Sequence, residues 1–315
     1  MLVISASPHI HTRNTVSRCM WKVVAALVPA LVCALFYFGI GAAVVTVTSI
    51  AGCVMAEYLI TRFMLRRDAT IANGSAVLTG LLLAFNLPSN LPVWIVLIGA
   101  FVAIGIGKMA FGGLGCNIFN PALVGRVFLL LSFPAQMTTW PLPSVSRWMY
   151  PDAATGATPL GLLKQGIMTF DDINLTDCLL GAIGGSLGEV SAIALLLGGI
   201  YLLATRIISW HIPVSILATV ALLSVGIGVN PWVELLSGGM LLGAIFMATD
   251  YVTSPMCHRG MIVYGIMIGV ITIIIRQWGA YPEGMSFAIL LMNGCTPLIN
   301  RYIKPRKFGE RRAKR

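Results

Sequence analysis

The sequence predicts an all-α polytopic membrane protein with about ten transmembrane helices. Three observations lead to this fold class: the composition, the series of apolar segments and the placement of positive charge. Of the 315 residues, 57% are hydrophobic and only 10% are charged, whereas a soluble domain carries about 25% charged residues. So few charges cannot cover a solvated globule of this size. The composition therefore excludes a soluble enzyme and favours a chain that lies in a bilayer.

The apolar segments are separated by glycine, proline or charged residues, which is the pattern of consecutive membrane-spanning helices. In chain order the predicted spans are residues 23–38, 40–60, 73–87, 92–107, 121–133, 178–204, 212–229, 231–248, 260–275 and 282–298. They divide the chain into a cytoplasmic N-terminal segment, a first transmembrane repeat, an outer loop, a second transmembrane repeat and a basic cytoplasmic tail. These parts are residues 1–22, 23–133, 134–176, 177–300 and 301–315.

The placement of charge predicts the orientation. The formal net charge is +10, with 21 Lys and Arg. Most of these cations, Lys108 among them, fall at one side of the predicted spans, and only Arg147, Lys164 and Arg276 fall at the other. Positive residues stay on the cytoplasmic side of a membrane, so we expect both termini inside and the loop at 134–176 outside. Cytoplasmic loops and the basic tail account for the net charge of +10. The positive charge therefore does not indicate a nucleic-acid partner, and we expect none.

Five spans on each side of the loop predict two repeats of inverted topology, because each half crosses the membrane an odd number of times. Interrupted segments recur in the two halves. NGSAVLTGLLLAFNLPSN (73–90) matches ELLSGGMLLGAIFMATD (234–250), and GLGCNIFNPAL (113–123) matches LMNGCTPLIN (291–300). Glycine and proline break helices, and the freed backbone groups must face protein or a polar cavity. We expect a pair of broken helices that meet at a central site; the alternative is that the glycines only permit close helix packing.

Ionisable residues within apolar segments are costly in a membrane, so each is a candidate site residue. Asp250 ends a broken segment and either binds a cation or pairs with a neighbouring helix. Glu189 is the second candidate for an ion pathway, with a structural ion pair as its alternative. Arg126 lies within a predicted span and either pairs with an acid or approaches a bound cofactor. Glu57 and Glu234 lie near predicted span ends, where we expect their side chains to reach the interface.

Two asparagines and two cysteines lie in the matching glycine-rich segments. Asn117 and Asn120 either bond to the edge of a cofactor ring or satisfy the carbonyls of a broken helix. Cys116 and Cys295 either ligate an iron–sulfur cluster or act as small apolar fillers. The second interpretation is favoured because four ligands are usual for such a cluster. The seven cysteines lack CxxC spacing, and no metal site is expected.

The outer loop contains the motif Asp152-Ala-Ala-Thr155-Gly156-Ala157-Thr158-Pro159. Proline biases the residue before it toward an extended backbone, and the small neighbours give little steric cover. We therefore expect the Thr158 hydroxyl on an accessible, strand-like segment that suits esterification. The alternative is a turn built from small residues.

The motif DAATGAT resembles the flavinylation motif D-x-x-(S/T)-G-A-(T/S). Its surroundings, SPHIHTRNTV, GSAVLTGLLLAFNLP, FGGLGCNIFNPALVGRVFLLLSFPAQMTTW and MATDYVTSP, resemble the RnfD/NqrB family over nearly the whole chain. Within the family, the chain looks more like the RnfD branch than the quinone-reducing NqrB branch. Two features favour RnfD: the absence of a long N-terminal extension and the segment SFPAQMTTW.

The resemblance implies a subunit of a ferredoxin:NAD oxidoreductase complex in the inner (plasma) membrane, where electron transfer drives Na⁺ or H⁺ translocation. Such a subunit is not catalytic alone, and its partners are the other Rnf subunits and the bilayer. It also implies that a flavin transferase joins FMN to Thr158 through a phosphoester. In that motif Asp152, Thr155, Gly156 and Ala157 are the neighbouring attachment residues.

Further expectations follow from the same resemblance. The family fold is similar to that of urea and ammonium transporters, and a second, noncovalent flavin such as riboflavin is expected within the bundle. Asn117, Asn120 and Arg126 are the candidate flavin contacts. Two alternatives remain: a solute channel of the urea or ammonium type, and the NqrB subunit of a Na⁺-pumping NADH:quinone reductase.

Overall fold

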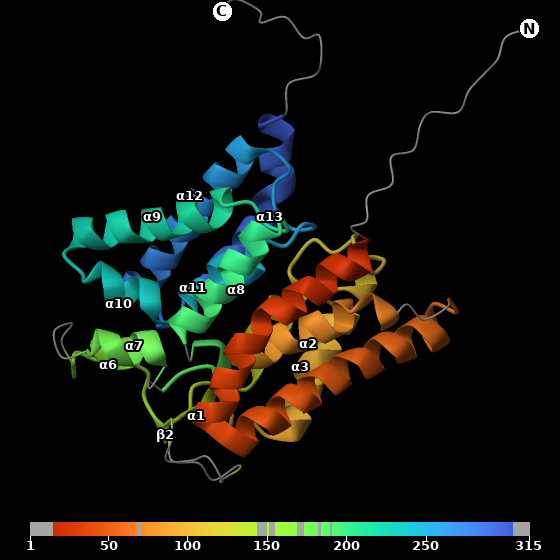
Figure 1. The fold of residues 1–315 in the computed structure, drawn as a ribbon, viewed down its shortest axis with the longest axis horizontal. Coiled ribbons are helices and arrows are strands. Elements are labelled where there is room, and N and C mark those ends of the chain that lie inside the picture. The colour runs from red at the N-terminus through yellow and green to blue at the C-terminus, as the bar shows by residue number, and fades with distance from the viewer. Residues whose placement is uncertain are drawn as a thin grey trace, which may run out of the picture.

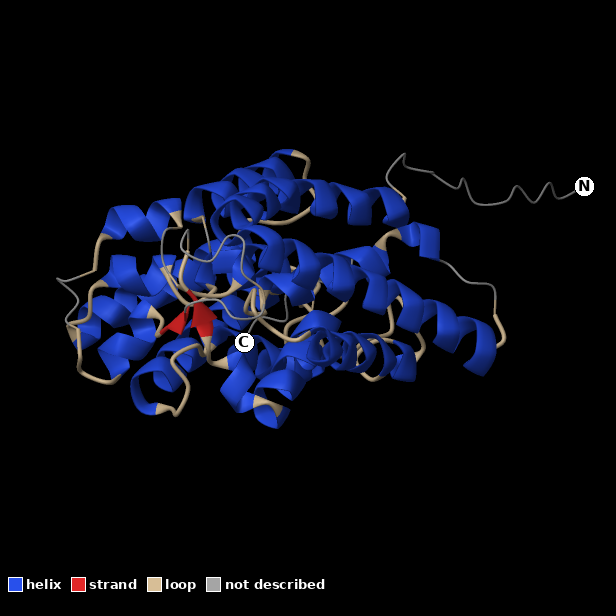
Figure 2. Cartoon of the chain, turned by 90° about the horizontal axis from the view of Figure 1, so that it is seen from below, coloured by secondary structure: helices blue, strands red, loops and turns tan. Residues whose placement is uncertain are grey.

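The computed structural model describes residues 15–67, 71–143, 150, 155–168, 173–181, 184–189 and 191–304 (Figure 1). Helices dominate this part of the chain, as Figure 2 shows in blue. The strands β1 (Trp140–Pro141) and β2 (Thr155–Gly156) pair antiparallel, with Trp140 opposite Gly156. The predicted all-helical class is therefore confirmed, and the short ribbon lies in the predicted outer loop.

The chain begins with α1 (Val16–Leu59), which is 44 residues long. Thr15 caps it by accepting a hydrogen bond from the backbone N–H of Arg18 at 3.3 Å. At about 1.5 Å per residue a straight helix of this length would measure about 66 Å, twice the bilayer core of about 30 Å. The helix instead bends at Gly39, whose φ of 57° and ψ of −127° are not helical. The bend separates the first two predicted spans and folds α1 into two arms.

The remaining helices of the first half agree with the predicted spans. They are η2 (Ile71–Asn73), α2 (Ser75–Phe85), α3 (Val93–Gly105), η3 (Met109–Phe111) and α4 (Pro121–Ser132), after the π-helical turn η1 (Ile60–Met64). The start of α4 follows from its sequence, because Asn120 accepts from the N–H of Ala122 at 3.1 Å and Pro121 suits the first turn.

The second half is more interrupted. Its elements are α5 (Pro134–Met137), α6 (Pro159–Lys164), α7 (Leu175–Leu180), η5 (Leu187–Glu189), α8 (Ala192–Ala204), α9 (His211–Ile227), α10 (Pro231–Leu236), α11 (Met240–Leu242), η6 (Gly243–Met247), α12 (His258–Trp278) and α13 (Met285–Tyr302). The predicted span at 178–204 is wrong as a continuous helix, whereas the predicted span at 231–248 is interrupted, as expected for the segment 234–250. Glycines at 181 and at 238–239 adopt left-handed φ angles, which end one helix before the next begins.

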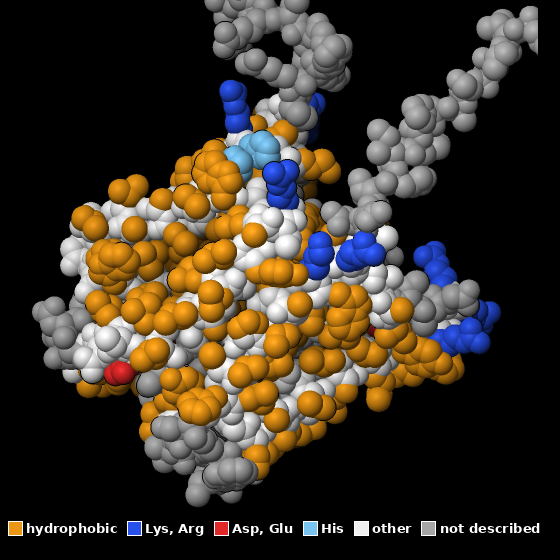
Figure 3. Space-filling model, in the orientation of Figure 1, with side chains coloured by type: hydrophobic (Ala, Val, Ile, Leu, Met, Phe, Trp, Pro, Cys, Tyr) orange, Lys and Arg blue, Asp and Glu red, His pale blue; other side chains and the backbone are white. Residues whose placement is uncertain are grey.

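Three helical stretches among the described residues are long and apolar enough to cross a bilayer: Val16–Met64, Val93–Phe111 and His258–Trp278. Shorter apolar helices are Ser75–Phe85, Pro121–Ser132, Ala192–Ala204 and His211–Ile227. Figure 3 shows hydrophobic side chains spread over the visible face, with Lys and Arg gathered toward the end where α1 starts and α13 ends. This surface is typical of a multi-pass membrane protein.

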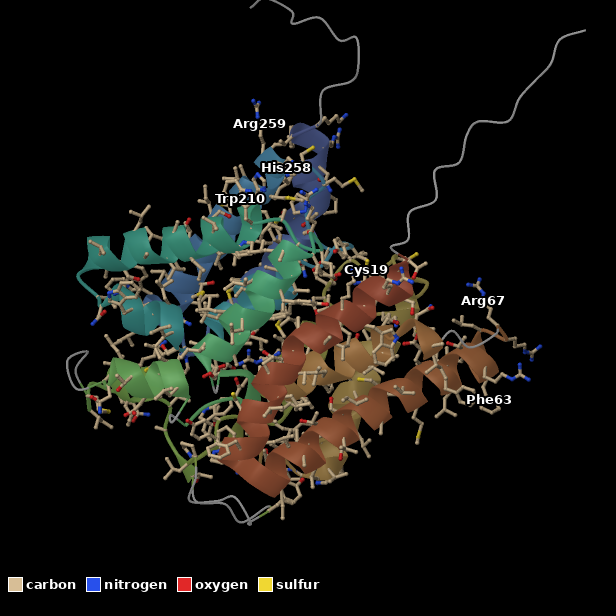
Figure 4. The ribbon with its side chains drawn as sticks, in the orientation of Figure 1. Cys19, Phe63, Arg67, Trp210, His258 and Arg259 are labelled. Atoms are coloured by element: carbon tan, nitrogen blue, oxygen red, sulfur yellow. The ribbon has the colours of Figure 1, made fainter. Side chains whose placement is uncertain are left out.

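The outer-loop elements lie at the opposite end of the molecule. In Figure 1, β2, α6 and α7 stand away from the start of α1 and the end of α13. Figure 4 shows Cys19, Arg67 and Arg259 at the end where the chain starts and finishes. The described residues of the DAATGAT motif, 155–158, thus lie away from the end of the molecule where Cys19, Arg67 and Arg259 are found.

The two interrupted helices meet in the core. Both α2 and α11 start after a left-handed glycine, Gly74 and Gly239. The Asn86 side chain at the end of α2 contacts Met247 Sδ at 3.7 Å, and Asn120 Nδ2 donates to the Met247 carbonyl at 3.2 Å. The carbonyl freed at the end of η6 is therefore satisfied by protein. Of the two roles expected for Asn120, this contact corresponds to the second, in which the side chain satisfies a carbonyl of a broken helix.

Candidate functional site

Thr158 caps the N-terminus of α6 in the outer-loop region. Its φ of −67° and ψ of 154° are extended, as the following proline predicts, and its Oγ1 accepts a hydrogen bond from the N–H of Gly161 at 3.1 Å. The expected accessibility is wrong, because only 5% of Thr158 is exposed. The residue folds back over α6 as its cap instead of standing on an open strand. Thr155 and Gly156 do form a strand, which pairs with β1.

Thr158 and Ala157 line a cavity of about 370 Å³, here named the outer cavity. Its walls come from α4, α5, β1, α6 and the turn before α13. Besides these two residues it is lined chiefly by Arg126, Met137, Trp140, Gly161, Lys164, Tyr281 and Glu283. Lys164 Nζ donates to the carbonyls of Gly279 and Tyr281, the latter at 3.1 Å, and this ties α6 to the turn before α13. The cavity has both cations and aromatic rings around the candidate acceptor.

Arg126 forms a buried ion pair with Glu283 at the inner wall of the outer cavity. Its Nη1 also donates to Asn86 Oδ1 at 2.9 Å and to Ser286 Oγ at 2.5 Å. Helix α4 of the first half is thereby joined to the start of α13 in the second half. An acid partner or a cofactor was expected for Arg126, and the acid is Glu283, which the sequence pattern did not single out. The only feature of the sequence that could have indicated Glu283 is the position of its carboxylate at the start of the last predicted span, 282–298.

A second cavity, here named the inner cavity, lies between α1, α2, the segment before α4 and η6. It is smaller, at about 80 Å³. Its polar lining comprises Cys19, Ser75, Thr79, Lys108, Asn117, Asn120, Thr249 and Asp250. Asp250 Oδ2 accepts from Thr253 Oγ1 at 3.3 Å, and Asn117 and Asn120 line the same cavity as Asp250. The two candidate asparagines are therefore close to Asp250.

The family model of the NQR2, RnfD, RnfE family matches residues 3–309 of this chain. The chain belongs to this family. Its relatives include the D subunit of the Na⁺-translocating ferredoxin:NAD⁺ oxidoreductase complex of Acetobacterium woodii, which is 46% identical over all of this chain and 97% of the relative. The D subunit of the proton-translocating ferredoxin:NAD⁺ oxidoreductase complex of Clostridium ljungdahlii is 45% identical over 99% of this chain and 97% of the relative.

A further NQR2, RnfD, RnfE family relative is the D subunit of the ion-translocating oxidoreductase complex of Stutzerimonas stutzeri. It is 40% identical and covers 94% of this chain and 93% of the relative. The family resemblance inferred from the motifs is thus confirmed over the whole chain.

Two expectations for this family chain are overturned by buried ion pairs. Glu57 and Glu234 do not reach an interface, because 4% and 2% of these residues are exposed. Lys108 Nζ donates to Glu57 Oε2 at 2.6 Å and to Ser75 Oγ at 2.8 Å. Arg276 Nη1 donates to Glu234 Oε2 at 2.5 Å. Lys108 and Arg276, which were predicted to lie outside the spans, are therefore interior residues.

The other candidates of this family chain are placed as follows. Glu189 is buried in η5 and accepts from Ser186 Oγ at 2.9 Å, within electrostatic range of Arg126 and Glu283. Cys116 and Cys295 are both exposed, so they do not act as buried fillers. Among the residues that the structure describes, no group of three or more His, Cys, Asp or Glu side chains forms a metal site. Asp152 lies outside the described residues.

Proposed function

We propose that this chain is a membrane electron-transfer subunit that carries FMN through a phosphoester on Thr158. The proposal rests chiefly on one observation: the Thr158 of a complete DAATGAT motif lines a cavity of about 370 Å³. Lys164 and Arg126 supply positive charge at this cavity, and Trp140 and Tyr281 supply aromatic surface. These groups suit a phosphate and a flat ring system.

In this proposal the residues of the chain hold the cofactor, and flavin supplies the redox chemistry when it is bound. In a reaction performed by a flavin transferase, the Thr158 hydroxyl loses its proton and its oxygen attacks the flavin-side phosphorus of a flavin dinucleotide. The new O–P bond forms as the pyrophosphate P–O bond breaks, and the nucleoside monophosphate leaves. Lys164 lines the same cavity and offers its cation to the phosphate. The tether restricts the flavin to the outer cavity, so a deep nucleotide pocket is not required.

The names of the relatives support a place in a larger assembly. We propose that the chain is the RnfD component of an Rnf-type complex that couples electron transfer from ferredoxin to NAD⁺ with ion translocation, beside the other subunits of that complex. One of two similarly related proteins is named Na⁺-translocating and the other proton-translocating. Overall identity therefore does not discriminate between the two ions. The relatives' names favour neither the solute-channel nor the NADH:quinone reductase alternative.

We also propose the topology. Ten spans in two inverted repeats, similar to the urea and ammonium transporters, place both termini in the cytoplasm and the outer cavity on the outer side of the plasma membrane. The separation of the basic end from α6 in Figure 1 supports this orientation. A cysteine introduced at Asp171 should react with a membrane-impermeant maleimide in intact cells. Reaction only after the cells are permeabilised would contradict the topology.

The inner cavity is the candidate site of a second flavin. The asparagines and Asp250 of the inner cavity suit the ring edge of a noncovalent flavin such as riboflavin, but about 80 Å³ is too small for that ring without movement of the walls. The fit is therefore incomplete. Extraction of the Thr158→Ala chain with acid, followed by chromatography, tests it: release of flavin supports the second site, and its absence counts against it.

The decisive experiment tests covalent FMN. The chain is co-produced with the flavin transferase, denatured and separated by electrophoresis. We expect a flavin-fluorescent band for the wild type and for Thr155→Ser, which keeps the motif, and no band for Thr158→Ala. A fluorescent Thr158→Ala band, or a wild-type mass without the FMN adduct, would overturn the proposal.

A further inference from the structure

A third cavity, here named the turn cavity, lies beside the turn that joins α8 to α9. Its volume is about 320 Å³, and a single water needs only about 10–15 Å³, so the cavity has room for a ligand. Arg206, Ser209 and Ser254 contribute polar groups to its wall, and Ile207 and Met261 contribute apolar surface. Among the described residues that line it, Arg206 is the only charged one. The turn cavity therefore favours a ligand of negative charge.

The Arg206 side chain has no partner of its own. Its guanidinium forms no ion pair and no hydrogen bond within the described part of the chain, and the residue is exposed. Its backbone is left-handed, with a φ of 54°. The N–H of Ile207 donates to the Leu202 carbonyl at 3.0 Å across this residue, a contact typical of a helix end where glycine is preferred. Arginine is thus unfavourable for the backbone here, and its side chain is free to hold a ligand.

Ser254 supplies a second open group in the turn cavity. Only 8% of this residue is exposed, and its hydroxyl has no hydrogen-bond partner among the described residues. Its oxygen is not enclosed, unlike the unpaired Oε1 of Glu283, and the residue lines the cavity. The neighbouring Thr249 hydroxyl, in contrast, donates to the Ile245 carbonyl at 2.6 Å. Because hydroxyls of nearly buried residues are usually paired, the Ser254 hydroxyl is available to a ligand in the turn cavity.

The turn cavity lies where a bilayer surface is expected. Helices α8 and α9 are apolar and have 13 and 17 residues, so the turn between them falls at one face of the membrane. Trp210, at the end of this turn, is 57% exposed and stacks on His211 with ring centroids 4.2 Å apart. Figure 4 shows Trp210 toward the same end of the molecule as Arg259. Tryptophan is enriched at the membrane–water interface and arginine in the adjoining loops, so the cavity adjoins the lipid phosphates.

We propose that the turn cavity binds an anionic phospholipid through its phosphate. Arg206 donates charge-assisted hydrogen bonds to the phosphate oxygens, and Ser254 donates one from its hydroxyl. Ile207 and Met261 contact the glycerol end of an acyl chain. A free phosphate would use the same donors but leave this apolar wall unused, and a zwitterionic lipid would bring a cation that meets no carboxylate among the described lining residues. The site does not involve Thr158, so it stands apart from the proposed function.

The test measures ligands bound to the full-length chain by native mass spectrometry in detergent, with each variant mixed with the wild type in one sample. The probes are phosphatidylglycerol, phosphatidylcholine and inorganic phosphate. We expect the wild type to bind phosphatidylglycerol more tightly than phosphatidylcholine. Arg206→Gly should weaken phosphatidylglycerol binding at least about tenfold and Ser254→Ala about fivefold, the effects of losing a charged and a neutral donor. The control is Arg301→Gln, which removes an exposed cation in the last turn of α13, outside the cavity, and should bind as the wild type does.

Glycine is chosen at position 206 because it suits a left-handed backbone. The Arg206→Gly chain should therefore unfold at the wild-type temperature or higher in lipid-free detergent, so its loss of binding does not come from loss of fold. Equal phosphatidylglycerol binding by Arg206→Gly and the wild type would overturn the inference, as would equal binding of the two lipids by the wild type. Inorganic phosphate bound as tightly as phosphatidylglycerol would indicate a site for the free anion and would contradict the lipid. Loss of partner subunits instead of lipid from Arg206→Gly would assign the cavity to a protein interface and overturn the inference too. If Arg206→Gly does not accumulate, Ser254→Ala decides by the same comparison.

Discussion

Two buried arginine–glutamate pairs in this protein differ in what surrounds them. Arg276 donates to Glu234 and to the carbonyls of Ser237 and Gly238, at 2.9 and 3.2 Å. Glu234 uses both carboxylate oxygens, since Oε1 accepts from Gln277 Nε2 at 3.2 Å. In the other pair, Glu283 Oε1 has no partner among the described residues, although its carboxylate lines the outer cavity.

The comparison shows how the surroundings of the two pairs differ. Nε of Arg276, like Nε of Arg126, lacks a hydrogen bond within the described residues, so this nitrogen does not distinguish the pairs. Arg276 packs against Gly238, where an added Cβ would lie 2.5 Å from Nη2, so its space is filled by backbone. Arg126 and Glu283 instead line the outer cavity. The enclosed pair fixes α12 to the α10–α11 junction, and the other pair forms part of a cavity wall.

The largest effect should come from breaking the enclosed pair. Arg276→Ala leaves Glu234 buried without its cation, which costs about 3–5 kcal/mol. We expect a large loss of folded chain, measured by thermal unfolding in detergent. The Gln277→Ala variant is the control, because it removes one neutral donor. Similar unfolding temperatures for Arg276→Ala and the wild type would contradict the structural role of this pair.

Breaking the cavity-lining pair should cost less. In Arg126→Ala the Glu283 carboxylate can be hydrated from the outer cavity, so we expect a loss of stability smaller than in Arg276→Ala, on the order of 1–3 kcal/mol. The measurement is the same unfolding experiment on chains without flavin. A loss as large as that of Arg276→Ala would remove the distinction between the two pairs.

The Lys108–Glu57 pair extends the comparison to the first half. Each single replacement, Lys108→Met or Glu57→Leu, leaves a buried charge, whereas the double replacement leaves none. We therefore expect the double variant to be more stable than either single variant in a double-mutant cycle. Additive losses would mean that the two side chains act independently, contrary to their 2.6 Å contact.

The smallest effect concerns the opposite side of the outer cavity. Thr158→Val removes the oxygen that caps α6, which typically costs about 1 kcal/mol, while Thr158→Ser keeps it. In chains without flavin we expect faster hydrogen exchange at the Gly161 amide in the valine variant alone. Equal exchange in both variants would show that this cap contributes nothing to α6.

The sequence predicted local backbone structure well where a single residue type determines it, as proline does. The helix from Pro121 begins where an asparagine precedes a proline, and Thr158 is extended because a proline follows it. The glycines at 238–239 predicted a broken helix within residues 234–250, and the structure has one there. The break at Gly181 was missed because apolar composition continues through it. Hydropathy does not register such a break.

The site could be predicted only in part, because its chemistry depends on distant pairings. The motif around Thr158 is contiguous and visible in the sequence. Arg126 and Glu283, in contrast, are separated by 157 residues, and Lys108 and Glu57 by 51. Nothing in the local pattern tells a buried cation from one in a loop, so Lys108 was assigned to the cytoplasmic side and Arg276 to the outer side.

The wall shared by α4 and the start of α13 imposes an order on biosynthesis. At about 5–20 residues per second, the 157 residues from Arg126 to Glu283 take on the order of 10 s to synthesise. Residues 155–158 leave the ribosome within that interval, before the outer cavity can close. A nascent chain that stops short of α13 therefore presents Thr158 without this wall. Completion of the last helix is the step that closes the outer cavity around Thr158.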